Sequence, residues 1–563
     1  MLQKIIECVP NFSEGRDANI IKQITDAIES VDGVMLLHVD MGKDTNRTVV
    51  TFAGEPSRVV EAAFLGIQKA AELIDMRTHK GEHPRMGATD VCPLVPVSGI
   101  TMEECAKWSM VLAEKVGGSL GIPVYLYEDA QANKQRSNLS VIRGGEYEGF
   151  SEKIKLPEWK PDFGPVELPL KHGATVIGAR DFLIAYNINL NTKSTRLANR
   201  IAFDVREAGR VKREGNPISG KTVLDENGEP VRIPGTLKSV KAIGWYIEEY
   251  GMAQISMNLT NYKITSVHKA FDEVCLKAND RGIRVTGSEL VGLVPLQPLL
   301  DAGKHYLALQ GRSLGVSENE LIEIAVQSLG LNQLGEFKPS ERIIEYVLMD
   351  RSKKLLVDYN VLDFVNETAS ESPAPGGGSV SALSAALGVA LGSMVANLSA
   401  EKRGWEDQLN VFSGWAEKAQ EIKKELLYLV DEDTNAFNKI MDSFQLPKNT
   451  DDEKSIRSSA IEAASIYATE IPLKTMKVAY SGIDILKYMV EHGNPNSITD
   501  AGVGLLCVKT AVRGAYFNVM VNAKGLKDKE TAKKYATEAK SILANNHKQI
   551  DEILLKVEEA INF

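Results

Sequence analysis

The sequence predicts a multidomain protein: two α/β subdomains, α+β sandwich-like, followed by an all-α helical-bundle domain. Its 563 residues are more than one hydrophobic core normally holds. Over about the first 350 residues, short β-rich runs alternate with helical patterns, which is typical of α/β layers. Beyond that point β-rich runs nearly vanish and long helical periodicities replace them, which indicates a separate helical domain.

In the first part, the patterns predict strands at 34–39, 48–52 and 123–127 and a helix over 59–74. A second α/β unit is expected to start near 175–180, with strands at 182–189 and 253–258. Between these strands, 209–235 is rich in Gly, Pro and charge and is predicted to be an excursion from the fold. We therefore expect subdomains at 1–181 and 182–348.

After a polar linker at 349–356, the remaining residues 357–563 read as one helical domain. Helical periodicity is predicted for the following segments: 379–400, 405–443, 453–490, 500–523 and 528–560. The uncharged stretch 376–398 is long enough to span a bilayer. Because Gly, Ala and Ser dominate it, we interpret it as a bundle helix and expect no membrane association.

Composition restricts the class of protein further. A hydrophobic fraction of 44% allows sizeable cores, and a net charge of −10 without a Lys/Arg block argues against a nucleic-acid partner. The five cysteines are scattered without a CxxC pair, so we expect a reducing, cytoplasmic location and no disulfide framework. The N-terminal residues are too charged to resemble a signal peptide.

A cluster of titratable residues occupies 77–87. His79, Glu82, His83 and Arg85 lie there among glycines and a proline, which favours a loop that carries acid/base chemistry and an anion anchor. The same letters fit the H-x-x-E-H pattern of a zinc hydrolase, which needs both imidazoles on one helical face. Gly81 and Pro84 disfavour that helix, so we expect no metal. The alternative to an acid/base site is a solvated basic loop without a catalytic role.

The helical domain begins with a glycine-rich segment that contains Gly376, Gly377, Gly378 and Ser379. Free backbone N–H groups at a helix start can meet an anion, although the segment lacks the Lys-Ser/Thr ending of a nucleotide loop. A tight turn into the helix is the structural alternative.

Further along, Asp433 falls on the same helical face as Ile422, Leu426, Leu429 and Val430, whereas Asp431 turns away. A carboxylate among apolar residues is either a buried ion pair or a functional acid.

Several segments resemble the formiminotransferase-cyclodeaminase family in order along nearly the entire chain. The transferase half is matched at 8–15, 46–49, 81–90 and 144–148, and the cyclodeaminase half at 429–433, 446–450 and 514–519. The resemblance implies that His83 is the acid/base of the transfer and that Asp433 is the catalytic residue of the cyclisation.

It also implies a folate pocket that includes Gly164, Pro165, Val166, Glu167, Leu168, Pro169, Leu170, Lys171, His172 and Gly173. We expect the glycine-rich segment with Ser379 to contribute to folate binding in the second site. In the transferase, Arg47 and Arg85 are candidate partners for the carboxylates of a glutamate substrate. Asp40 and Glu82 are candidates for orienting His83 or binding an amidinium.

The expected function is transfer of a formimino group from formiminoglutamate to tetrahydrofolate, followed by cyclisation with loss of ammonia. The resemblance implies tetrahydrofolate, in its polyglutamylated form, as the co-substrate, and a cyclic homo-oligomer as the assembly. Two alternatives stay open: a transferase whose helical domain is only an oligomerisation scaffold, and a metal-dependent hydrolase built on His79, Glu82 and His83.

Overall fold

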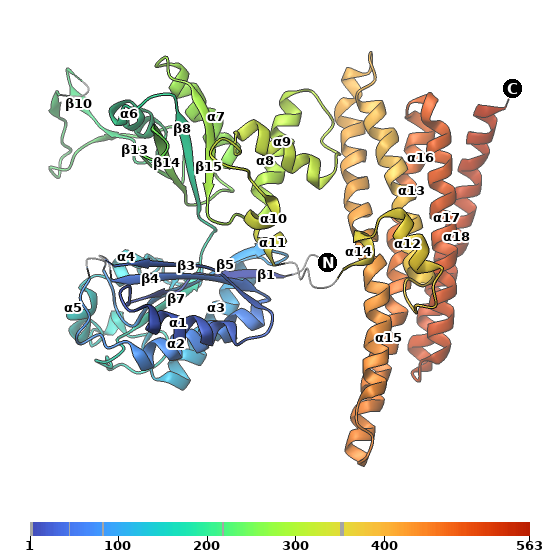
Figure 1. The fold of residues 1–563 in the computed structure, drawn as a ribbon, viewed down its shortest axis with the longest axis horizontal. Helices are drawn as coiled ribbons and strands as arrows, with labels where there is room; N and C mark the ends of the chain where they lie inside the picture. The colour runs from blue at the N-terminus through green and yellow to red at the C-terminus, as the bar shows by residue number, and fades with distance from the viewer. Residues whose placement is uncertain (1–3, 44–45, 82–83, 217–218, 349–353, 563) are drawn as a thin grey trace. The chain divides into compact units, whose positions relative to one another are not determined.

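The computed structural model describes residues 4–43, 46–81, 84–216, 219–348 and 354–562. The chain forms two compact units (Figure 1). The first contains residues 1–302 and 325–349, and the second contains 303–324 together with 350–563.

The first subdomain is built on a seven-stranded sheet of order β1-β4-β2-β5-β7-β6, with β3 paired to β4. The strands are β1 (Ile5–Cys8), β2 (Asn11–Phe12), β3 (Val34–Gly42), β4 (Arg47–Gly54), β5 (Thr89–Ser98), β6 (Val124–Glu128) and β7 (Thr175–Ala179). Helices α1 (Ala18–Glu29), α2 (Pro56–Leu73) and α3 (Met102–Leu120) pack along one face of the sheet (Figure 1).

The run at 175–180 was expected to open the second unit, and this expectation is wrong. The run forms β7, which pairs in parallel with both β5 and β6 inside the first sheet. A parallel partner is always distant in sequence, so local patterns do not reveal to which sheet such a strand belongs.

The face of this sheet opposite the helices carries a row of directly paired residues, namely Asp40, Val49, Asn11 and Val91. Its apolar end is covered by a second core that includes Val91, Tyr125, Phe150 and Leu168, to which α4 (Leu139–Ile142) and α5 (Glu146–Lys153) contribute. Its polar end is therefore the part of the sheet that is available to a ligand.

The second subdomain has a four-stranded antiparallel sheet of order β13-β14-β8-β15. Its strands are β8 (Ile184–Leu190), β13 (Val240–Ile247), β14 (Met252–Leu259) and β15 (Val285–Val291), and α6 (Thr195–Val205) and α7 (Val267–Asn279) pack against them. The excursion at 209–235 forms two small antiparallel pairs: β9 (Arg210–Val211) with β12 (Arg232–Ile233), and β10 (Arg213–Glu214) with β11 (Lys221–Thr222).

The remaining helices of the α/β region are α8 (Leu296–Leu309), α9 (Glu318–Leu329), α10 (Pro339–Arg342) and α11 (Ile344–Val347). The segment 303–324, which holds the end of α8 and the start of α9, packs with the helical unit. There the Ser313 hydroxyl donates to Asn397 at 2.7 Å, and Lys304 pairs with Glu417 at 2.6 Å.

The helical domain consists of α12 (Val361–Thr368), α13 (Gly377–Ala400), α14 (Leu409–Gln445), α15 (Asp451–Ser481), α16 (Ile483–His492), α17 (Ile498–Gly525) and α18 (Lys529–Ile561). The single segment expected at 453–490 is divided at Gly482, where a Cβ would meet the side chain of Val389. Helix α13 is apolar and long enough to cross a membrane, but 61% of its most apolar window is buried inside the bundle.

Candidate functional sites

Three loops meet at the polar end of the first sheet. The segment 84–88 lies against the predicted folate stretch, because the Ala88 N–H donates to the His172 carbonyl at 2.8 Å and the Ala174 N–H donates to the Met86 carbonyl at 3.1 Å. Gly173 must be glycine here, since its φ is +68° and a Cβ would overlap the Met86 carbonyl. The fold thus joins two predicted site segments that are far apart in the sequence.

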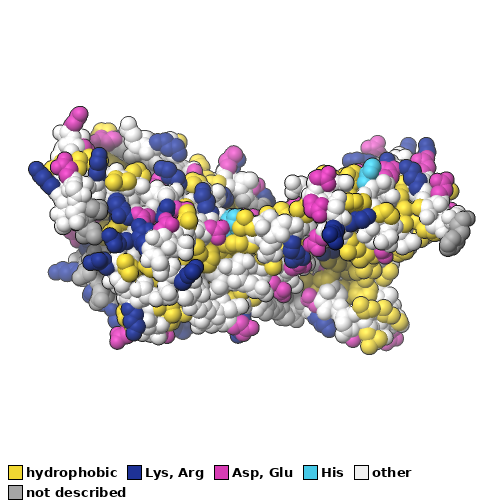
Figure 2. All heavy atoms as spheres, turned by 90° about the horizontal axis from the view of Figure 1, so that it is seen from above, with side chains coloured by type: hydrophobic (Ala, Val, Ile, Leu, Met, Phe, Trp, Pro, Cys, Tyr) yellow, Lys and Arg dark blue, Asp and Glu magenta, His cyan; other side chains and the backbone are white. Residues whose placement is uncertain are grey.

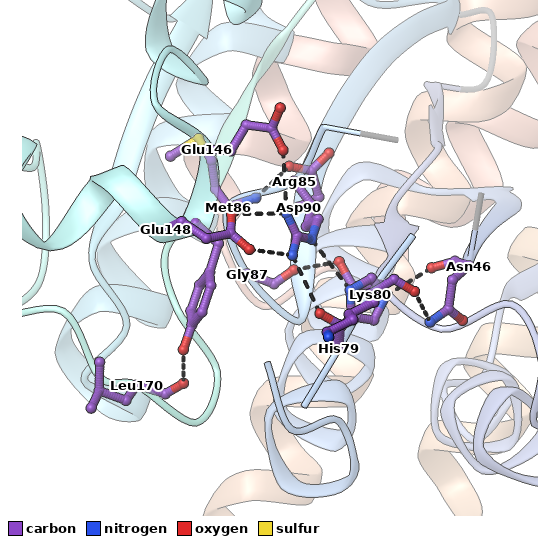
Figure 3. Close-up of polar contacts among 12 residues, drawn as sticks. Asn46, His79, Lys80, Arg85, Met86, Gly87, Asp90, Glu146, Glu148 and Leu170 are labelled. Atoms are coloured by element: carbon purple, nitrogen blue, oxygen red, sulfur yellow. Dashed lines mark hydrogen bonds and ion pairs between the residues drawn. The ribbon is translucent and has the colours of Figure 1, made fainter. Parts of the chain in front are cut away.

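The other end of the folate stretch is tied to the segment at 144–148. The Tyr147 hydroxyl donates to the Leu170 carbonyl at 2.6 Å, and the Tyr147 N–H donates to the Arg85 carbonyl at 2.8 Å (Figure 3). Val166 and Leu170 are exposed and Leu168 is buried, so the stretch has a side that a ligand can reach.

His79 uses both of its ring nitrogens within this site. Its Nε2 lies 2.9 Å from the Asn46 carbonyl, and its Nδ1 accepts a hydrogen bond from Arg85 at 3.3 Å. This pattern is that of a neutral imidazole with its proton on Nε2. Burial lowers the pKa of His79, which agrees with the neutral form. His79 is thereby engaged as a structural link between Asn46 and Arg85.

The guanidinium of Arg85 is held by two glutamates. It donates to Glu148 at 2.6 Å and to Glu146 at 3.2 Å, while its own side chain is only 9% exposed. An open hollow of about 600 Å³ is lined by Arg85, the two glutamates, Lys80, Gly81 and Gly145. A carboxylate of a substrate would have to replace one of these glutamates to bind Arg85.

A second arginine cluster lies next to this hollow around Asp90. Asp90 is buried and ion-paired with Arg143, and its carboxylate also accepts the Met86 N–H at 3.0 Å. Arg47 donates to the side chain of Asn11 and lies within electrostatic range of both Asp90 and Arg143. Burial raises the pKa of Asp90, and the neighbouring arginines oppose that rise.

The predicted acid/base residue His83 and its neighbour Glu82 lie outside the described residues. The ends of the described chain on either side, Gly81 and Pro84, belong to the segment that carries Arg85. Asp40 is exposed on β3, in the same cross-strand row as Asn11. Asp40, Arg47 and Arg85 therefore all come from the polar end of this sheet or its loops.

In the helical domain, Asp433 caps the start of α13. Its Oδ2 accepts the Ser379 N–H at 3.0 Å and the Ser379 hydroxyl at 3.2 Å. The N-cap residue that precedes the helix, Gly376, supplies no side-chain cap of its own. A Cβ on Gly378 would overlap the Asp433 carboxylate, so the close approach requires glycine at that position.

Among the described residues, Asp433 has no charged partner. Burial raises the pKa of its carboxyl, and the two hydrogen bonds from Ser379 partly offset that rise. Asn518 of α17 lies nearest to Gly377, and its amide donates to the Gly514 carbonyl at 3.0 Å. Asn522 instead bridges helices by donating to the Ala468 carbonyl at 2.7 Å.

The two acids that precede Asp433 serve other contacts. Asp431 accepts the Leu356 N–H at 2.6 Å. Glu432 is buried and accepts a hydrogen bond from Tyr467, and Lys439 lies 3.7 Å away. Phe437, one turn beyond Asp433 on α14, is 39% exposed.

The sequence interpretation missed Asp90, Arg143 and the glutamate pair around Arg85. Asp90 has a recognisable signal, since it is a lone charge at the start of the apolar run 91–95. Arg143 has none, because only the fold brings it to Asp90. Among the described residues, no group of three His, Cys, Asp or Glu side chains is placed to hold a metal ion.

Comparison with known proteins gives consistent matches along the chain. Family models match residues 5–180 (Formiminotransferase domain, N-terminal subdomain), 185–349 (Formiminotransferase domain) and 360–541 (Formiminotransferase-cyclodeaminase). The formimidoyltransferase-cyclodeaminase of Gallus gallus is 43% identical over 531 residues, which are 94% of each chain.

Two further relatives extend this result. The formimidoyltransferase-cyclodeaminase of Dictyostelium discoideum is 41% identical over 556 residues, covering 98% of each chain. A glutamate formimidoyltransferase of Thermoplasma acidophilum is 46% identical over 309 residues, which are 54% of this chain and 93% of that protein. The α/β half thus has relatives without a helical domain.

Proposed function

Because the chain belongs to the formimidoyltransferase-cyclodeaminase family, we infer that it is an enzyme with two fused activities. It transfers the formimino group of N-formimino-L-glutamate to tetrahydrofolate, and it then cyclises 5-formiminotetrahydrofolate to 5,10-methenyltetrahydrofolate with release of ammonia. The observation that carries this conclusion is the alignment of both halves with fused relatives over 94–98% of the chain.

The transfer step needs a group that titrates near neutrality. N5 of tetrahydrofolate attacks the amidine carbon, and glutamate leaves from the tetrahedral intermediate. We propose that His83 takes the N5 proton and returns it to the departing nitrogen, a role for which histidine is suited. Such a group typically contributes about 10²–10⁴-fold.

The polar end of the first sheet supports binding of a dicarboxylate substrate there. We propose that Arg47 and Arg85 bind its carboxylates, that Asp40 or Glu82 orients His83 or binds the amidinium, and that 164–173 contributes to the folate pocket. Support comes from the hydrogen bonds that join 164–173 to the segment of Arg85.

In the cyclisation, N10 attacks the formimino carbon and ammonia departs. We propose Asp433 as the acid/base, since burial raises its pKa towards the range in which a carboxyl can both accept and donate a proton. We further propose that the loop of Gly376, Gly377 and Gly378 contributes to folate binding.

The helical domain supports a proposal of homo-oligomers. Its helices expose many large hydrophobic side chains, and patches of them are visible on this domain in Figure 2. On α13 and α17 they form stripes with helical spacing, namely Val380, Leu387, Met394 and Leu398, and Val503, Leu506, Phe517 and Val521. Exposed apolar stripes of this extent are typical of subunit interfaces. We propose a cyclic homo-oligomer in the cytoplasm that uses polyglutamylated tetrahydrofolate.

The test is an assay of the purified protein with tetrahydrofolate and formiminoglutamate, following methenyltetrahydrofolate absorbance and ammonia in parallel. We expect both products. Glutamate release without ammonia would instead favour a transferase whose helical domain only assembles the oligomer, a reading that the exposed stripes also allow.

A further inference from the structure

The two oxygens of the Asp433 carboxylate lie in different surroundings. Oδ2 receives both hydrogen bonds from Ser379, at 3.0 Å from the backbone N–H and 3.2 Å from the hydroxyl. Oδ1 accepts no hydrogen bond from any described residue and lies over the Cα of Gly378, where a side chain would collide with it. One oxygen is therefore fixed and the other is left for a ligand.

We propose that Ser379 is a positioning residue of the cyclising step: it anchors Oδ2 of Asp433 and leaves Oδ1 as the oxygen that exchanges protons with the substrate. This inference rests on the proposed cyclodeaminase function. It gives Ser379 a role towards Asp433 in addition to the folate contact predicted from the sequence.

The hydroxyl of Ser379 is itself held in place. Its single hydrogen is shared between Oδ2 of Asp433, at 3.2 Å, and the Val430 carbonyl, at 2.8 Å, one helical turn before Asp433 on α14. Because the backbone and the side chain of one residue grip the same oxygen, rotation of the carboxylate would break both hydrogen bonds together. The free oxygen is thus kept at one place.

Neighbouring charges do not compete for this carboxylate. Helix α13 carries no titratable side chain. On α14, Asp431 is bonded to the Leu356 N–H, while Glu432 is engaged with Tyr467 of α15 and lies 3.7 Å from Lys439. Helix α17 presents the neutral Asn518 near Gly377. The ionisation of Asp433 is thus governed by burial, which raises its pKa, and by Ser379, which lowers it.

The proton balance of the step closes through Oδ1. N10 forms a bond to the formimino carbon of the amidinium, and Oδ1 accepts the proton that N10 then loses. The same proton passes to the formimino nitrogen, the carbon–nitrogen bond breaks, and ammonia leaves with that electron pair. The positive charge remains on the methenyl product, and Asp433 is again a carboxylate.

The test compares Ser379→Ala with the matched variant Ser384→Ala in the full-length protein. Ser384 lies on the same helix, but its hydroxyl donates to the Cys507 carbonyl at 3.1 Å. Ammonia release from 5-formiminotetrahydrofolate is measured against pH. In Ser379→Ala, the part of the pH–rate profile that reflects the ionisation of Asp433 should shift to higher pH by about one unit. The reason is that a hydrogen bond to the ionised form is lost.

Ser379→Ala should also lower kcat for ammonia release about tenfold, while Ser384→Ala and the transferase step stay unchanged. Ser379→Thr, which keeps a hydroxyl, should restore the wild-type profile. If Ser379→Ala does not fold, Ser379→Cys should show a smaller shift in the same direction.

An unchanged pH profile in folded Ser379→Ala would overturn the inference while the proposed function stands. A wild-type protein that releases no ammonia would instead refute the cyclodeaminase function, and the inference with it.

Discussion

Asp90 in the first α/β subdomain is a buried carboxylate and Asp433 in the helical domain is a half-buried one, and the fold stabilises them differently. Asp90 is ion-paired with Arg143 and lies within electrostatic range of Arg47. Asp433 has no cationic partner in the part of the chain that the structure describes and is held by the N–H and the hydroxyl of Ser379 at the start of a helix. Its charge is therefore stabilised by neutral donors and by the helix dipole.

This difference fits the two chemical tasks that we propose for these sites. A site for a substrate with two carboxylates needs arginines that are kept in place, and buried acids such as Asp90 can keep them there. A site that moves a proton needs a carboxyl that is not locked in its ionised form. An arginine beside Asp433 would lower its pKa and remove that property.

The largest effect is expected from a variant of Asp433. Asp433→Asn should reduce ammonia release by about 10²–10⁴-fold, since an amide cannot exchange protons in this way. Formimino transfer by the same protein, measured as glutamate release, should stay within about twofold of wild type. Near-normal ammonia release would mean that another group performs the proton transfer.

At Asp90 the expected effect is on folding. Asp90→Asn should destabilise the α/β unit by about 3–5 kcal/mol, because Arg143 is left without its buried partner. Scanning calorimetry that resolves the two units measures this, and the helical transition should not move. The control is Asp26→Asn, which removes an exposed pair with Lys22 and should change stability by at most about 1 kcal/mol. Equal effects of the two variants would contradict the buried role.

Glu7 allows the α/β unit to be tested through the pH dependence of its stability. Burial raises its pKa from 4.5 to about 7. Between these values the folded state holds a proton that the unfolded state has released, so stability falls as pH rises through this window. Glu7→Gln should remove that slope and stabilise the α/β unit at pH 8 by on the order of 3 kcal/mol. Parallel pH–stability curves for wild type and variant would show that Glu7 ionises normally.

A smaller effect is expected at Gly378, where the helical site depends on a missing side chain. Gly378→Ala should push Asp433 away from Ser379 and destabilise this contact by about 1–3 kcal/mol, with a loss of ammonia release. Gly414→Ala in α14 is the matched control, since its Cβ would meet no atom within 4 Å. If both variants retain full activity, the close approach at Gly378 is unimportant.

The smallest effect is expected at the rim of the transferase site. Glu146 is 44% exposed and shares Arg85 with Glu148, which keeps the shorter contact. Glu146→Gln should lower transferase kcat/KM by no more than about fivefold, as for other exposed ion pairs. A much larger loss would indicate that Glu146 contacts the substrate itself.

The sequence by itself determined the division into an α/β region and a helical region, and it singled out Asp433 as a candidate. Periodicity separates the α/β region from the helical region, and Asp433 is identifiable because a carboxylate interrupts an apolar helical face. The glycine-rich segment at 376–378 was identified as the start of a helix because a run of glycines precedes a helical pattern in the sequence. These features depend on residues within a few turns of one another.

Only the tertiary structure decided which distant groups meet. It placed β7 in the first sheet, joined Arg143 to Asp90, enclosed Arg85 between two glutamates, and packed 303–324 with the helical unit. It also showed that Ser379 binds Asp433 across 54 residues of sequence. Such partners leave no periodic trace, because parallel pairing and ion pairing between loops depend on how whole layers pack and not on the spacing of residues along the chain.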